Sequence, residues 1–454
     1  MKEEYRILSA TAILGYGFPE SSFEEGMKRN PHLIAVDAGS TDPGPYYLGA
    51  GISFTDREAV KRDLEIMLKA GIPQKIPIVI GTAGGSGGDP HLEWNREIIE
   101  EVARENNLHF KLALISAQFD KEYLAEQLKA GKIVSLDSSP ELSEEDILAS
   151  SNIVGQMGME PIIQALKAGA DVVLAGRAYD PAVFAAPAVM QGYDKGLAVH
   201  LGKILECASI CASPGSGSDC MFGYIGEDYF RVEPLNPIRK CTILSVAAHT
   251  LYEKSDPYIL PGPDGSLDLT GCNFLQETPN IVRVTGSKYI PAKNFTVKLE
   301  GAKQIGYSTV SISGTRDPVM ISKIDEIVKG VRSRVEDNFS KQNLKYYLNF
   351  NIYGKNGVMG PLEPVPPEAL GSHELGIVIE AVADTQKEAN TICSFARSTI
   401  LHYGYEGRRA TAGNMAFPYS PSDFQIGEVY VFSVYHLLSA DDTISPFPIE
   451  MEEL

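Results

Sequence analysis

Cationic side chains are scarce in this sequence, which has 40 Lys and Arg against 59 Asp and Glu over 454 residues and a formal net charge of −19. Nucleic acids and anionic membrane surfaces are bound by clustered Lys and Arg. The charge balance therefore argues against both partners and favours small molecules or other proteins.

Long apolar runs and cysteine pairs are also lacking. No apolar run approaches the ~20 residues of a membrane span, and the opening MKEEY does not resemble a signal peptide. We therefore expect a soluble, cytoplasmic protein. Six cysteines are too few for a disulfide framework in so long a chain, and no second pair has zinc-ligand spacing. We expect buried structural thiols.

Strand-like and helical segments alternate through the first two hundred residues. Short apolar runs predict strands at 33–37, 76–80, 111–116, 133–137 and 171–175, and helical patterns lie between them, as at 56–70 and 92–106. Such alternation predicts a parallel sheet with helices on both faces. The expected fold class is α/β.

The pattern changes after residue 213. We expect residues 1–213 to form a doubly wound, mainly parallel α/β domain. A Pro-Gly-Ser-Gly-Ser segment at 214–218 then leads into a mixed α+β domain over 214–454, with a sub-boundary at 361–372. A chain of this length should hold two or three domains, each large enough for its own core.

A glycine-rich loop is the most distinctive segment. The run KIPIVIGTAGGSGGDPHLEWN (75–95) predicts a strand, a loop and the start of a helix. Glycine allows positive φ and close backbone approach, and helix N-termini attract anions. The sequence therefore predicts that Gly84, Gly85, Ser86, Gly87 and Gly88 bind a phosphate or carboxylate. Close helix–sheet packing would explain the same glycines, and the Lys-Ser/Thr of a P-loop is absent.

Polar residues follow several of the predicted strands. Ligands bind outside the carboxyl ends of parallel strands, so we expect these residues to converge on one rim. The predicted acid/base residues are Asp37, Asp42, Asp89, His91 and Glu160, and the predicted substrate-binding residues are Ser40, Thr41, Arg177 and Asp180 together with the glycine loop.

Each of these residues also has a structural explanation. Asp42, Asp89 and Asp180 each precede proline, as turn initiators and N-caps do. Arg177 can simply pair with a neighbouring carboxylate, and His91 can be a satisfied loop histidine. A guanidinium also offers a two-pronged contact to a carboxylate or phosphate, and several carboxylates can hold Mg²⁺. The metal requirement stays open, and no nucleotide cofactor is indicated.

Eight sequence blocks resemble the acyclic terpene utilisation family typified by AtuA. The matching blocks are VDAGSTDPGPYYLG (36–49), GTAGGSGGDPH (81–91), QMGMEP (156–161), DVVLAGRAYDPAVFAA (171–186), EPLNP (233–237), AAHTLYEKSDPY (247–258), VKLEGA (297–302) and YGKNGVMG (353–360). The resemblance implies a role in carboxylic acid or acyl-CoA catabolism. Longer relatives carry an added ferredoxin-like domain with a GDKGN-type motif, which this sequence lacks, so the resemblance also implies that a separate small subunit can supply it. We further expect a homo-oligomer.

Two functions from different classes follow. The first is a hydratase/dehydratase-type lyase acting on a small branched carboxylic or hydroxy acid or its acyl-CoA thioester, with Arg177 and the glycine loop binding the acid end. In this lyase reaction, His91 and one of Asp37, Asp42 or Asp89 would transfer the proton. Such chemistry needs a base, an acid and a positive centre that stabilises the enolate. The second is a non-catalytic subunit that binds an acyl-CoA or organic acid. A nucleotide-dependent ligase or kinase ranks below both.

Overall fold

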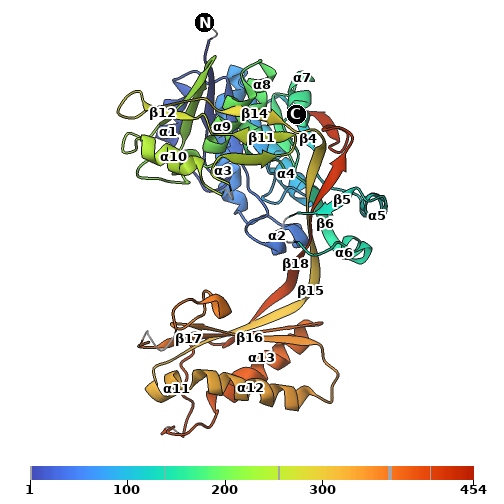
Figure 1. Ribbon diagram of the computed structural model, residues 1–454, viewed down its shortest axis with the longest axis vertical. Coiled ribbons are helices and arrows are strands. Elements are labelled where there is room, and N and C mark those ends of the chain that lie inside the picture. Colours follow the sequence, from blue (N-terminus) through green and yellow to red (C-terminus); the bar gives the residue numbers. More distant parts are fainter. Residues whose placement is uncertain (1–2, 137–138, 254–255, 367–370, 410) are drawn as a thin grey trace. The chain divides into compact units, whose positions relative to one another are not determined.

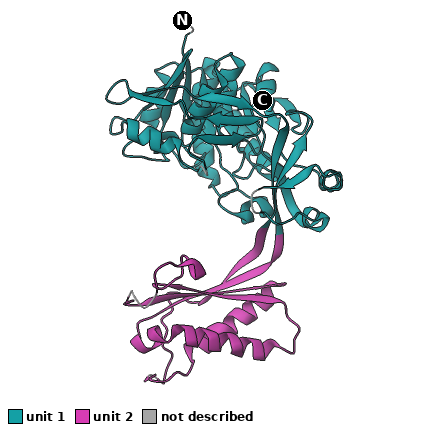
Figure 2. Cartoon of the chain, in the orientation of Figure 1, with its two compact units in different colours: residues 1–303, 432–454 teal, residues 304–431 magenta. Residues whose placement is uncertain are grey.

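The chain has two compact units (Figures 1 and 2). A computed structural model describes residues 3–136, 139–253, 256–366, 371–409 and 411–454. Unit 1 contains residues 1–303 and 432–454, and unit 2 contains residues 304–431. Two long neighbouring strands, β15 (Phe295–Thr315) and β18 (Asp423–Ala440), carry the chain from unit 1 into unit 2 and back (Figure 1).

Unit 1 is built on a ten-stranded mixed sheet. Its strands, in spatial order, are β12 (Asn273–Gln276), β13 (Val282–Thr285), β9 (Tyr229–Pro234), β8 (Met221–Ile225), β1 (Tyr5–Ser9), β2 (Leu33–Asp37), β3 (Ile78–Gly81), β7 (Val172–Ala175), β4 (Lys111–Ile115) and β19 (Ile449–Glu453). Neighbours from β1 to β4 pair in parallel. The strands beyond them pair antiparallel. The sheet therefore has a parallel centre and antiparallel flanks.

Both faces of the parallel centre are buried. Side chains alternate between the faces of a strand, and Val36, Ile80 and Leu174 belong to one core while Ala35, Val79 and Val173 belong to the other. The first core also contains residues of α1 (Glu20–Met27), α3 (Arg57–Gly71) and α4 (Asp89–Asn106). The second contains residues of α7 (Glu160–Lys167), α8 (Asp180–Met190) and α9 (Lys195–Leu205). Two-sided burial explains why these strands are continuous apolar runs.

The rest of unit 1 consists of shorter elements. A three-stranded antiparallel sheet contains β10 (Ile259–Gly262), β11 (Gly265–Asp268) and β14 (Lys288–Pro291). The remaining elements are α2 (Pro45–Ala50), η1 (Ile72–Gln74), α5 (Lys121–Lys129), β5 (Ile133–Ser135), α6 (Glu144–Ala149), β6 (Ser150–Gly155), η2 (Ala208–Cys211) and α10 (Ile243–Thr250).

Unit 2 packs helices against a sheet around its own core. Its strands are β16 (Tyr346–Tyr353), β17 (Leu375–Ala383) and the adjoining parts of β15 and β18, and its helices are α11 (Pro318–Ser322), α12 (Ile324–Phe339), η3 (Gly360–Leu362) and α13 (Gln386–Leu401). β17 alternates between buried and partly exposed residues, and its buried Ile377 and Ile379 share a core with Val331 and Ile392 of the helices. This alternation indicates a sheet covered on one face.

The structure confirms the mixed α/β class and differs from the sequence prediction in two ways. The boundary expected at 213/214 falls inside unit 1, because β8 and β9 extend the sheet antiparallel from β1. The strand expected at 133–137 in the parallel sheet is β5, which pairs antiparallel with β18 instead. Residue 137, and residues 367–370 of the 361–372 segment, lie outside the described residues. No helix in the described ranges is both long enough and apolar enough to cross a membrane.

Candidate functional site

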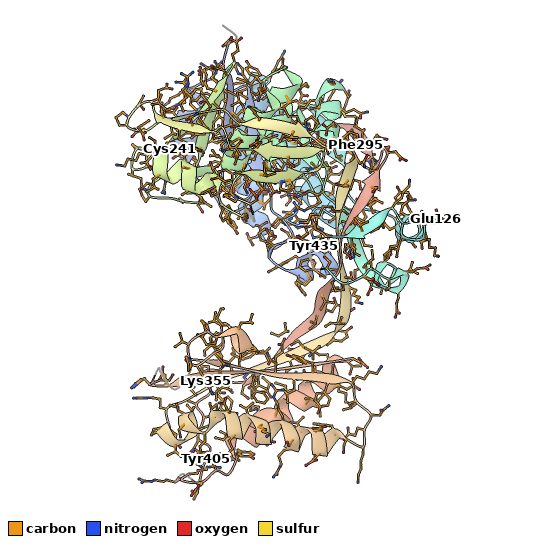
Figure 3. The ribbon with its side chains drawn as sticks, viewed as in Figure 1. Glu126, Cys241, Phe295, Lys355, Tyr405 and Tyr435 are labelled. Carbon is orange, nitrogen blue, oxygen red and sulfur yellow. The ribbon has the colours of Figure 1, made fainter. Side chains whose placement is uncertain are left out.

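A cavity of about 530 Å³ lies in unit 1 at the carboxyl end of β7. This volume is within the roughly 300–1,000 Å³ of typical ligand sites. We call it the main cavity. Its charged lining residues are Asp42, Arg177, Asp180, Lys203, Glu206, Glu253 and Lys298. Apolar and aromatic residues complete the wall, including Tyr179, Leu260, Leu437 and Tyr435, which Figure 3 labels on β18.

Arg177 anchors one side of the main cavity through a buried ion cluster. Its Nε donates to Glu300 Oε2 at 2.7 Å, and its Nη1 lies 3.2 Å from Asp180 Oδ1. Lys298 Nζ and Thr41 Oγ1 donate to Glu300 Oε1 at 2.9 and 2.8 Å. Burial alone would raise the pKa of Glu300, but the charges and hydrogen bonds of Arg177 and Lys298 outweigh it and lower that pKa to about 2. The hydrogen bonds of Arg177 to the described residues run from its Nε and Nη1 atoms.

Lys203 anchors the other side. Its Nζ donates to Glu206 Oε1 at 2.6 Å and lies 3.0 Å from Glu253 Oε2. Lys203 and Glu206 are both buried, one turn apart at the C-terminal end of α9. Burial raises the pKa of Glu206 to about 8, helped by the charge of Asp180 and opposed by Lys203. The other carboxyl oxygen of Glu206, Oε2, is buried and has no hydrogen-bond partner among the described residues.

Burial raises the pKa of three neighbouring carboxyl groups, Asp37, Asp180 and Glu206. Burial raises the pKa of Asp37 well above its usual value, and the charges of Asp180 and Glu206 add to the effect. Burial likewise raises the pKa of Asp180, although Arg177 and Lys203 oppose the shift. A raised pKa favours the neutral, proton-donating form of a carboxyl, and Glu206, whose pKa is raised to about 8, is therefore a candidate general acid.

The glycine loop contacts the backbone of Arg177. Its residues line neither the main cavity nor a smaller cavity that adjoins it. Gly84, Gly85 and Gly87 have positive φ, and a Cβ at Gly85 would lie 2.5 Å from the Phe54 ring. The carbonyl of Gly87 accepts a hydrogen bond from the Arg177 backbone N–H at 3.1 Å. The described contacts give the loop a packing role that positions Arg177, while anion binding by its residues, including the buried Ser86, stays a prediction.

Alanine at Gly87 is expected to destabilise the protein, because its Cβ would lie 2.2 Å from the Arg177 backbone nitrogen. Gly131 is a matched control, with φ of +70° against +73° and open space around its Cβ. Both substitutions carry the conformational cost of a left-handed residue, roughly 1–2 kcal/mol. In urea denaturation, the substitution at Gly87 alone should lower the free energy of unfolding by a further amount of about 1–3 kcal/mol or more. Equal losses at the two sites would contradict the close contact.

The other predicted acid/base residues lie outside the main cavity. His91 is fully buried, and its Nε2 lies 3.1 Å and 3.2 Å from the carbonyls of Tyr47 and Ile52, so it ties the α2 segment to α4. Burial lowers its pKa. Asp89 is in the first turn of α4 and accepts a hydrogen bond from Ser116 Oγ at 2.6 Å. These contacts hold both side chains in place, and acid/base roles for the two residues stay predictions.

Glu160 belongs to a separate cluster with Lys195 and Asp264. Lys195 Nζ lies 3.7 Å from Glu160 Oε1 and also pairs with Asp264. Burial raises the pKa of Glu160, and the charge of Asp264 adds to the shift. The structure thus brings together Asp37, Ser40, Asp42, Arg177 and Asp180 around the two cavities, places Thr41 on Glu300, and leaves His91, Asp89 and Glu160 elsewhere.

Five charged residues of this site were missed by the sequence analysis as acid/base or binding residues. They are Lys203, Glu206, Glu253, Lys298 and Glu300. The available signal was charge inside apolar segments, since Lys203 interrupts the apolar end of α9 and Glu300 lies within the strand run VKLEGA. Charged residues are almost never fully buried unless they are paired.

No group of three or more His, Cys, Asp or Glu side chains that could hold a metal ion is found among the described residues.

The fold and the cavity define a mixed α/β protein with buried, mutually interacting carboxyl groups beside paired cations. The family model described as acyclic terpene utilisation family protein AtuA matches residues 57–216 and 239–424. These regions cover most of the chain, and the chain belongs to this family. A search of curated proteins and a search of solved structures each found no match.

Proposed function

We propose that the chain is a hydratase/dehydratase-type lyase that acts on a small branched hydroxy or unsaturated carboxylic acid, or on its acyl-CoA thioester. The observation that carries the proposal is the buried Glu206 carboxyl, one of whose oxygens has no hydrogen-bond partner among the described residues, in the same cavity as Arg177 and Lys298. A doubly wound arrangement of the parallel strands would place ligands at this end of the sheet. The family name supports an acid derived from an acyclic terpene.

The residues suggest a division of roles. Arg177 Nη2 and Lys298 bind the carboxylate or thioester oxygen and stabilise the negative charge that develops there. Asp42, which accepts a hydrogen bond from Ser40 Oγ at 2.8 Å, removes the proton from the α-carbon. Glu206 gives its proton to the β-hydroxyl, the C–O bond breaks, the C=C bond forms, and water leaves. Hydration follows the same steps in reverse.

The alternative is a non-catalytic subunit that binds the same acid. The cations on both sides of the main cavity would serve binding equally well, since both are held by carboxylates that fix their positions. The two functions differ in whether the α-carbon exchanges its proton.

The deciding experiment incubates the purified chain with β-hydroxy acids, α,β-unsaturated acids and their CoA thioesters in D₂O. A lyase exchanges or adds deuterium at the α-carbon, which mass spectrometry detects. Asp42→Asn and Glu206→Gln should lower the exchange rate by about 10²–10⁴-fold, whereas Lys69→Met, an exposed change on α3, should not. Ligand binding without exchange, also in the presence of a small ferredoxin-like subunit, would favour the binding function.

A further inference from the structure

A smaller cavity of about 270 Å³ adjoins the main cavity. The two share Asp42, Asp180, Glu206 and Glu253 in their walls. We call the smaller one the acidic cavity, because Asp37 joins the four shared carboxyls and none of the described residues in its wall is Lys or Arg. Three aromatic side chains, Tyr16, Phe54 and Tyr252, also line it.

The carboxyls of the acidic cavity outnumber the cations that pair with them. Arg177 contacts Asp180, and Lys203 contacts Glu206 and Glu253. Asp37 is buried and forms no ion pair within the described part of the chain, where its carboxyl accepts a hydrogen bond from the Gly39 N–H at 3.0 Å. Buried uncompensated negative charge is costly, so the excess must be neutralised by protons or by a bound cation.

Glu206 independently points to a ligand. Glu206 is only 3% exposed and lines the acidic cavity. Its Oε2 atom has no hydrogen-bond partner among the described residues. A buried acceptor of this kind is stabilised by any donor that reaches it. A ligand with N–H donors would satisfy it.

The chemistry of the wall selects among cations. A metal ion is disfavoured, because no group of three ligating side chains among the described residues is placed to hold one. An ammonium group instead combines N–H donors for carboxylates with a charge that is attracted to aromatic ring faces. We propose that the acidic cavity binds the ammonium group of a small organic amine. This proposal goes beyond the lyase function and does not require turnover.

Binding should strengthen as the pH rises, because an ionised Glu206 attracts the ammonium more strongly than a protonated one. The titratable groups that face Glu206 are Lys203, Asp180, Glu253, Asp37, Cys207 and Tyr179. An alkylammonium remains charged to about pH 10, so the ligand itself does not titrate between pH 7 and about 9. Binding should therefore release a proton at pH 7.

Isothermal titration calorimetry of the full chain with propylammonium chloride tests the proposal. We expect saturable binding that is tighter at about pH 9 than at pH 7, with an enthalpy at pH 7 that depends on the buffer because a proton is released. Glu206→Gln should weaken binding at least tenfold at pH 9, and Tyr252→Leu should weaken it several-fold. Lys69→Met is the control and should leave the affinity unchanged.

Two outcomes would overturn the proposal. One is the absence of saturable binding to the folded wild-type protein. The other is an affinity that Glu206→Gln leaves unchanged, provided that thermal unfolding shows the variant to be folded. Because propylammonium is not a substrate for the proposed lyase, either outcome leaves the deuterium-exchange result untouched.

Discussion

Replacing Arg177 with methionine is expected to lower the free energy of unfolding by about 3–5 kcal/mol, because it leaves a buried carboxylate without its partner. Arg177 is 3% exposed and Glu300 1% exposed, and they are joined at 2.7 Å. Lys298 remains bonded to Glu300 in the variant but is partly exposed and compensates only in part. Urea denaturation at pH 7 measures the loss.

Two comparisons make this prediction specific. Lys69→Met removes an exposed i,i+4 pair with Glu65 and should cost at most ~1 kcal/mol. Adding Glu300→Leu to Arg177→Met removes the uncompensated charge and should recover part of the lost stability. A loss at Arg177 no larger than that at Lys69, or no recovery in the double variant, would contradict the buried ion cluster.

Replacing Glu206 with glutamine is expected to raise the free energy of unfolding relative to the wild type, by a difference that grows as the pH rises. The pKa of Glu206 is raised by burial from 4.5 in the unfolded chain to about 8 in the folded protein. The folded state therefore keeps a proton that the unfolded state has lost. The resulting stability is fully present below about pH 4.5 and is lost as the pH rises through about 8.

Glutamine stays neutral and does not suffer this loss. The difference in unfolding free energy between variant and wild type should grow by on the order of 4 kcal/mol between about pH 5 and pH 8. Denaturation curves of both proteins across this range provide the measurement. A difference that stays constant with pH would show that the Glu206 carboxyl is already ionised in the folded protein near neutral pH.

Arg177 illustrates what could be predicted from the sequence. Arg177 was predicted as a site residue from its position after an apolar strand, and the structure places it in the main cavity with Asp42 and Asp180. The local sequence pattern is enough for this prediction, because the carboxyl ends of parallel strands lie at one edge of the sheet. Helix α4 after the glycine loop was also predicted, and its first residue is Asp89.

The partners of these residues could not be predicted in the same way. Glu300 lies 123 residues from Arg177 and reaches it from β15, and no local pattern reports such a contact. Glu206 was missed because α9 has the apolar pattern of an ordinary core helix. His91 was predicted to be catalytic from its chemistry and its position beside the glycine loop. The structure buries its side chain against two backbone carbonyls outside the main cavity, and its catalytic role stays a prediction.

We expect ligands to bind in the main cavity rather than at the glycine loop. A thermal-shift screen of the purified chain against hydroxy acids, unsaturated acids and acyl-CoAs tests it most directly, because a ligand bound to the native state raises the melting temperature by mass action. We expect a shift with one acid class that Lys298→Met abolishes and Asp89→Asn leaves intact. A shift that is abolished by Asp89→Asn and survives Lys298→Met would place the ligand at the glycine loop and contradict it.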